Sequence, residues 1–74
     1  MIKYYVLFPN HLNGLKLNEI LKNEKIENTI APTPRKLSSC CGMSLLVREE
    51  DIPDIERIIS RDMVEILKIA SVEY

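Results

Sequence analysis

Two adjacent cysteines, Cys40 and Cys41, are the residues of this sequence best suited to chemistry. Neighbouring Cα atoms across a trans peptide are about 3.8 Å apart, which is shorter than the roughly 4.4–6.8 Å that a disulfide usually spans. A bridge between them would be strained and would close no useful loop, so a structural disulfide is not expected. The two thiols are therefore predicted to be small apolar groups, metal ligands or reactive sulfur.

Positive charge accompanies the two cysteines. Arg35 and Lys36 precede them, and no acidic residue occurs between Asn28 and Arg48. Cationic side chains near a thiol favour the thiolate, which is the form that acts as a nucleophile. This pattern predicts a thiolate-stabilising role for Arg35 and Lys36, with a solvated loop tip as the alternative.

The small residues around the cysteines fit the same interpretation. Ser38 is expected to supply a hydrogen-bond donor or to cap the backbone, and Gly42 can adopt the positive φ that builds an anion-binding nest. Cys41, beside Gly42, is the favoured reactive thiol on a semi-rigid, exposed arm. For Cys40, a packing role and a catalytic role beside Cys41 are given equal weight.

The rest of the chain predicts the elements that would position this segment. The order is β-α-β-β-α-β, typical of a ferredoxin-like α+β fold, with a four-stranded antiparallel sheet in the order 4-1-3-2 and two helices on one face. Asn10 and Asp51 are expected to cap the helices, and Gly14 predicts a close packing contact. The apolar side of the first helix is expected to hold Leu17, Ile20 and Leu21, with Leu12 and Leu15 in the earlier turn. The expected strands are 2–8, 26–31, 43–48 and 64–72, and the helices are 11–24 and 52–63.

The connection between the two middle strands breaks this regular pattern. Eleven residues, 32–42, join strands that antiparallel neighbours usually connect with two to five. The predicted topology places this connection at the same end of the molecule as residues 9–13 and the start of the first helix. Residues 1–74 are thus expected to form one ferredoxin-like domain with a functional loop at 32–42.

Composition excludes several classes of function. The chain has 74 residues and a formal charge of −1, so it holds one domain and gives no reason to expect a nucleic-acid partner. The third predicted strand lacks the aromatic residues on which RNA-binding sheets of this topology stack bases. No apolar run is long enough to span a membrane, and the first residues indicate a strand rather than a signal peptide, so a cytoplasmic protein is expected.

The segment Pro32-Thr33-Pro34-Arg35-Lys36-Leu37-Ser38-Ser39-Cys40-Cys41-Gly42 resembles the signature of a small prokaryotic family, the Putative Se/S carrier protein-like family. The resemblance rests on P-T-P-R followed by S-x-x-C-G and matches Arg35, Ser38, Cys41 and Gly42. It implies a carrier, rather than a turnover enzyme, that holds sulfur or selenium as a persulfide or selenopersulfide. It also implies donor and acceptor proteins as partners and no cofactor.

Two other functions remain open from the sequence. A non-catalytic regulatory or protein-interaction module would use the loop as a docking site, because small domains of this fold serve many functions. A soft-metal binder would use the cysteines with Met43 or His11, but adjacent thiols give poor bidentate geometry, so no metal site is predicted. The helix-free sheet face, or an edge strand, predicts a possible homodimer.

Overall fold

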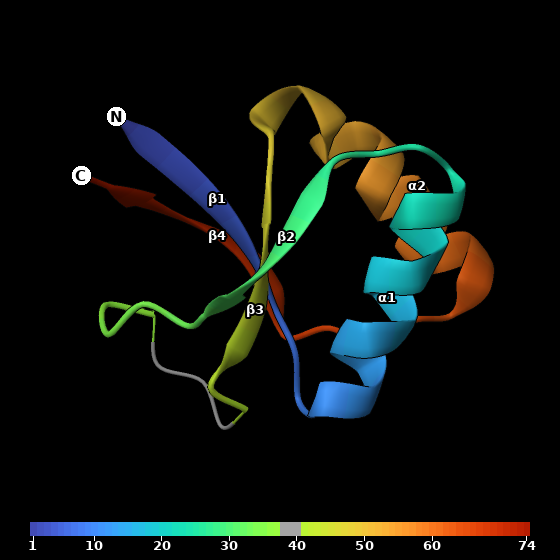
Figure 1. The fold of residues 1–74 in the computed structure, drawn as a ribbon, viewed down its shortest axis with the longest axis horizontal. Helices are drawn as coiled ribbons and strands as arrows, with labels where there is room; N and C mark the ends of the chain where they lie inside the picture. The colour runs from blue at the N-terminus through green and yellow to red at the C-terminus, as the bar shows by residue number, and fades with distance from the viewer. Residues whose placement is uncertain (38–40) are drawn as a thin grey trace.

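The computed structural model describes residues 1–37 and 41–74. Its sheet has the order β2-β3-β1-β4 with antiparallel neighbours, which confirms the predicted ferredoxin-like α+β arrangement. The two termini lie side by side at one end of the sheet (Figure 1). The elements are β1 (Ile2–Leu7), α1 (His11–Asn23), β2 (Asn28–Pro32), β3 (Met43–Val47), the short 3₁₀ helix η1 (Glu49–Asp51), α2 (Ile52–Asp62) and β4 (Lys68–Glu73).

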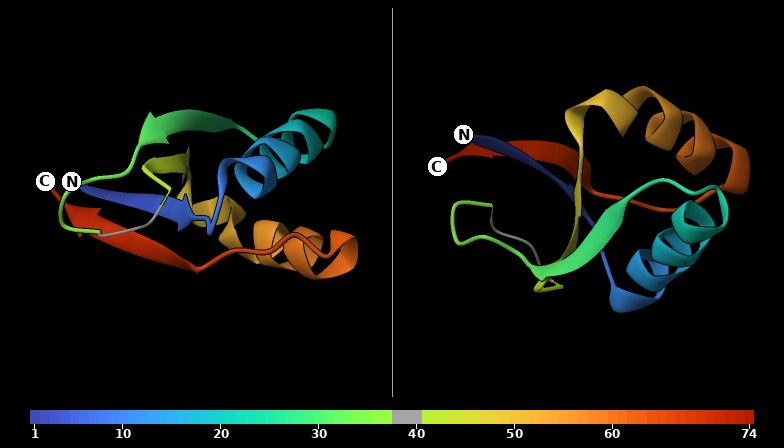
Figure 2. Two further views of the ribbon diagram at one scale, coloured as in Figure 1. Left: turned by 90° about the horizontal axis from the view of Figure 1, so that it is seen from below. Right: turned by 45° about the horizontal axis from the view of Figure 1, so that its top comes forward.

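The helices cover one face of the sheet, as predicted, and the segment after β2 passes on the other side (Figures 1 and 2). Because side chains alternate along a strand, β1 supplies both faces. Val6 belongs to the helix-side core, whereas Tyr5 and Leu7 belong to a smaller cluster on the helix-free face. The helix-side core comprises Val6, Phe8, Leu17, Leu21, Cys41, Met43, Leu45, Val47, Ile55, Ile58 and Val64.

Helix α1 begins as the sequence predicts and packs closely against β3. The Asn13 backbone N–H donates to Asn10 Oδ1 at 3.0 Å, which satisfies one N–H group of the first turn. An ideal Cβ placed on Gly14 would lie 2.8 Å from Met43 Cε and 3.2 Å from Phe8 Cδ2. Glycine at this position therefore lets the start of α1 approach β3, which confirms the predicted close contact.

The second helix and the last strand differ from the prediction. Asp51 does not cap α2 with its side chain; its carboxylate instead accepts from Arg48 Nε at 2.9 Å, across the 3₁₀ turn that precedes the helix. The last strand begins at Lys68 rather than at 64. The intervening segment is irregular because its backbone bonds elsewhere: the Val64 N–H donates to Ile59 O at 3.1 Å, and the Leu67 N–H donates to Leu7 O at 2.7 Å.

The helix-free face is less exposed than the sequence suggested. Tyr5, Leu7 and Val72 are buried there, and Leu37 and Ala70 pack against them. The segment after β2 thus covers part of the apolar surface that a homodimer through this face would use. Dimerisation stays a prediction, and light scattering that finds only a monomer at high concentration would contradict it.

On this face the hydroxyl groups of Tyr5 and Tyr74 form a hydrogen bond that affects the pKa of Tyr5. Tyr5 Oη lies 3.0 Å from Tyr74 Oη. This hydrogen bond and burial raise the pKa of Tyr5 to about 12. Because the folded state holds the Tyr5 proton above the pH at which an unfolded tyrosine loses it, this contribution to stability is complete below about pH 10 and is lost as the pH rises toward 12.

We expect Tyr74→Phe to lower the pKa of Tyr5, because the phenylalanine ring keeps the packing and removes the hydrogen bond. The titration can be followed at the Tyr5 ring carbons by NMR. An unchanged Tyr5 pKa in this variant would contradict the assigned cause.

Candidate functional site

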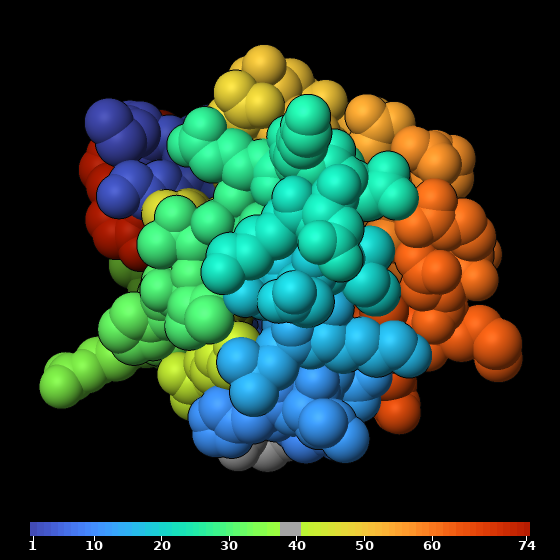
Figure 3. Space-filling view, turned by 45° about the vertical axis from the view of Figure 1, so that its right-hand side comes forward, coloured from blue at the N-terminus to red at the C-terminus, as the bar shows by residue number. Residues whose placement is uncertain are grey.

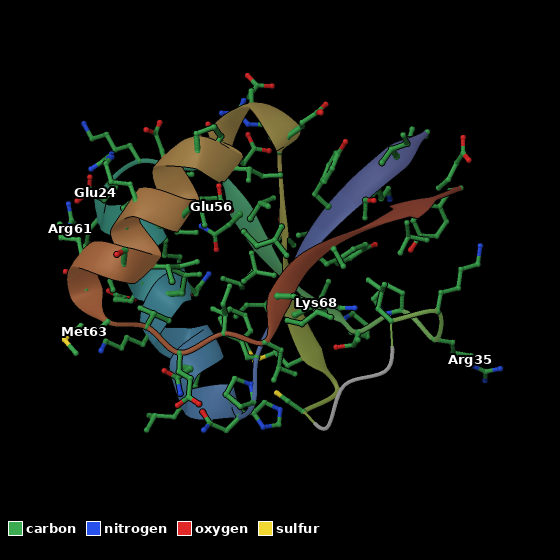
Figure 4. The ribbon with its side chains drawn as sticks, turned by 180° about the vertical axis from the view of Figure 1, so that it is seen from behind. Glu24, Arg35, Glu56, Arg61, Met63 and Lys68 are labelled. Atoms are coloured by element: carbon green, nitrogen blue, oxygen red, sulfur yellow. The ribbon has the colours of Figure 1, made fainter. Side chains whose placement is uncertain are left out.

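The cations of the loop lie at its tip, away from the core. The Leu37 backbone N–H donates to Pro34 O at 2.9 Å, which closes a tight turn with Arg35 and Lys36 at its centre. Both side chains are exposed, and Arg35 points outward from the folded body (Figure 4). Within residues 1–37 and 41–74, neither cation has a hydrogen bond or ion pair with another side chain.

Cys41 does not lie on an exposed arm, so that prediction is wrong. Only 8% of the residue is exposed, and it belongs to the helix-side core together with Phe8 and Met43. The physical reason is packing: Cys41 joins the cluster that contains Met43 and Leu45, which β3 directs toward the helices. Gly42 turns the chain between Cys41 and this strand. A thiol is a small, weakly polar group that such a core accommodates.

Gly42 adopts the backbone conformation that the sequence predicts. Its φ is +63°, a value that glycine reaches without the steric cost that other residues meet. Its carbonyl oxygen accepts from the Thr33 backbone N–H at 3.0 Å, which joins the two ends of the loop. Nothing lies within 4 Å of an ideal Cβ on Gly42, so the requirement for glycine comes from φ and not from space.

Next to this glycine lies an open hollow of about 380 Å³ between α1, β2 and the start of β3. We call it the α1–β2 hollow. In Figure 3 the yellow-green surface at the start of β3 shows between the green of β2 and the blue of α1. The hollow confirms that the first helix and the loop meet at one end of the molecule. It is lined by His11, Leu15, Ile30, Ala31, Pro32, Gly42 and Met43.

Sequence reasoning missed the exposure of two residues that line the hollow, Leu15 and Ile30. Leu12 and Leu15 were assigned to the apolar side of the first helix, but they are 75% and 52% exposed, and the buried stripe is formed by Leu17 and Leu21 instead. Ile30 on β2 is 49% exposed. The spacing of the leucines could have shown this. Leu17 and Leu21 are four residues apart and lie on one face of the helix, whereas Leu12 and Leu15 lie on other faces.

The predicted roles of Cys40 and Ser38 fall on residues 38–40, outside the described residues. Of the other predicted site residues, Gly42 directly follows Cys41 in the chain, whereas Arg35 and Lys36 lie at the exposed turn and not in the core that holds Cys41. Across the described ranges, no group of three or more His, Cys, Asp or Glu residues is arranged to hold a metal ion. Among the described residues, no helix is long and apolar enough to cross a membrane.

The segment from Thr33 to Gly42 thus combines a tight cationic turn, a core-facing cysteine and a glycine with positive φ. A family model described as Putative Se/S carrier protein-like matches residues 3–71, nearly the whole chain. The chain belongs to this family. Searches of curated proteins and of solved structures found no match.

Proposed function

We propose that this Se/S carrier-like protein holds sulfur or selenium on Cys41 as a persulfide or selenopersulfide. The observation that carries the proposal is the family match over residues 3–71, which includes Cys41 and the positive-φ Gly42 that follows it. A carrier needs a thiol, groups that stabilise its anionic adduct, and access to a donor and an acceptor protein. It needs no substrate pocket of its own.

The transfer is a thiol exchange that balances without an outside oxidant. The Cys41 thiolate attacks the outer sulfur of a persulfide on the donor protein. A sulfur–sulfur bond forms at Cys41 as the donor's own bond breaks, and the donor cysteine leaves as a thiolate. Delivery repeats the step with an acceptor nucleophile, and Cys41 is then the leaving thiolate. A selenium atom in the outer position follows the same course.

The burial of Cys41 gives the carrier a resting state. A side chain that is 8% exposed must leave the helix-side core before another protein's sulfur can reach it. Gly42 is suited to absorb the backbone rotation, because glycine occupies both signs of φ readily. The same burial would shield a loaded sulfur from small thiols in solution, which would otherwise release it.

The remaining loop residues support the adduct in this proposal. Arg35 and Lys36 favour the thiolate and the anionic adduct once Cys41 is exposed, and Ser38 adds a donor. Cys40 releases the cargo by attacking the Cys41 sulfur of the adduct: a Cys40–Cys41 disulfide forms as the bond to the outer sulfur or selenium breaks, and that atom leaves as sulfide or selenide. This transient disulfide protects Cys41 until an external thiol reduces it.

The double substitution Arg35→Gln with Lys36→Gln tests the role of the cations. We expect it to slow alkylation of the loop thiol near neutral pH, because less thiolate is present without the positive charges. The rate of iodoacetamide modification, measured over a pH series in the Cys40→Ser background, reports this directly. Identical rates with and without the cations would mean that they do not act on Cys41.

The carrier function itself can be tested by assaying sulfane sulfur. The protein is incubated with a cysteine desulfurase and cysteine, purified, and treated with cyanide, which removes an outer sulfur as thiocyanate. Wild type and Cys40→Ser are expected to yield thiocyanate, and Cys41→Ala is expected to yield none. Alanine is preferred to serine here because a hydroxyl would be buried in the helix-side core. Thiocyanate from Cys41→Ala at the wild-type level would reject Cys41 as the carrier.

A second candidate is a protein-interaction module without thiol chemistry. The observations that favour it are the burial of Cys41 and the exposure of Leu12, Leu15 and Ile30. Under this alternative the double variant Cys40→Ser with Cys41→Ala binds its partner as the wild type does and has no transfer to lose.

A further inference from the structure

The α1–β2 hollow presents apolar side chains that the fold itself does not cover. Leu15 on α1 and Ile30 on β2 form facing walls and are each about half exposed. Leu12, 75% exposed, extends the apolar surface by one turn of α1. A continuous apolar patch that borders a hollow in a small domain marks a binding surface more often than scattered exposed leucines do.

Unpaired backbone borders the same hollow. In the sheet order β2-β3-β1-β4, strand β2 is an edge and pairs only with β3 among the described strands. Edge strands present N–H and C=O groups that an extended segment of another chain can pair with. Pro32, at the end of β2, lacks an N–H and so limits such pairing to the part of β2 beside Ile30.

Charge indicates the character of the partner. The described residues that line the hollow include no acid, lysine or arginine, and His11 is the only polar side chain among them. A partner segment with apolar, uncharged side chains would therefore complement the hollow.

We propose that the α1–β2 hollow docks an extended, apolar segment on the protein that donates sulfur to Cys41. This inference rests on the proposed carrier function. It is supported separately by the place of the hollow next to the carrier cysteine: Gly42 and Met43 line the hollow and directly follow Cys41 in the chain. A donor seated there would hold its persulfide next to the carrier cysteine.

The test compares a protein donor with a small donor on matched variants. Ile30→Asp places a charge in the hollow, where docking would have to bury it against apolar side chains and where apolar contact is lost. Leu67→Asp is the control, because Leu67 is also a large aliphatic residue, also 49% exposed, and does not line the hollow. Each variant is loaded by a cysteine desulfurase with cysteine, or by glutathione persulfide, and the initial rate of adduct formation is measured by mass spectrometry.

We expect Ile30→Asp to slow loading by the desulfurase about tenfold or more, which corresponds to roughly 1.4 kcal/mol. Loading by glutathione persulfide should stay unchanged, and Leu67→Asp should match the wild type with both donors. Circular dichroism checks that each variant is folded, and Leu15→Asp, on the opposite wall, replaces Ile30→Asp if the latter does not fold.

Each other outcome has a defined meaning. Equal desulfurase rates for Ile30→Asp and wild type would overturn the docking proposal while leaving the carrier function intact. Slower loading by both donors would show that the hollow binds a small thiol, which also overturns docking of a protein. Loading of the wild type by glutathione persulfide but by no desulfurase tested would reject a persulfide protein of this class as the occupant. Loading by neither donor would reject the carrier function itself.

Discussion

Replacement of Leu17 by alanine is expected to lower the free energy of unfolding by about 3 kcal/mol, because the side chain is fully buried and its loss leaves a cavity. A domain of this length has a total stability of roughly 4–11 kcal/mol. The variant should therefore be folded but markedly less resistant to urea. Because Leu17 holds α1 against the sheet, the loss also weakens the wall of the α1–β2 hollow.

Leu12 on the same helix supplies the matched control. It is 75% exposed, so Leu12→Ala should change the free energy of unfolding by less than about 0.5 kcal/mol. Urea unfolding of the two variants, followed by circular dichroism, gives both values. Similar losses at the two positions would contradict the assignment of Leu17, and not Leu12, to the core.

Gly14→Val is expected to cost about 2–3 kcal/mol through overpacking. A Cβ at this position would lie 2.8 Å from Met43 Cε and 3.1 Å from Met43 Sδ, so the methionine must be displaced or α1 must move away from β3. Both responses disturb Met43, which lines the hollow and lies two residues after Cys41.

A double-mutant cycle with Met43→Ala isolates this contact. Shortening Met43 removes the atoms that the valine would meet, so Gly14→Val should cost at least 1 kcal/mol less in the Met43→Ala background than in the wild type. The free energies of unfolding of the four proteins are measured in urea. A coupling energy below about 0.5 kcal/mol would show that the close approach to Met43 does not explain the glycine.

The topology could be predicted because the strongest local signals agree with it. The apolar run before Phe8 predicts the first strand, and the Asn10 cap together with the spacing of Leu17 and Leu21 predicts the first helix. The β-α-β-β-α-β order then leaves few ways to arrange the sheet. Gly42 could also be predicted, because a glycine before a strand in a long connection favours a turn with positive φ, and the structure has +63° there.

The burial of Cys41 could not be predicted from the loop alone. Charge and proline content indicated an exposed arm, but the side chain packs among the apolar neighbours of the helix-side core. Asp51 failed as a cap for a local reason, because Arg48, three residues earlier, forms an ion pair with its carboxylate at 2.9 Å. The tertiary neighbours of Cys41 are not contained in the sequence pattern, and the pattern does not decide whether Asp51 accepts from the helix N–H groups or from Arg48.

The most direct test of the carrier function is intact mass spectrometry, without reductant, on wild type, Cys40→Ser and Cys41→Ala after incubation with a cysteine desulfurase. Cysteine supplies sulfur in one series, and selenocysteine supplies selenium in the other. We predict one added chalcogen atom per chain on wild type and on Cys40→Ser, and none on Cys41→Ala. An adduct that persists in Cys41→Ala, or that is absent from all three proteins, would contradict chalcogen carriage on Cys41.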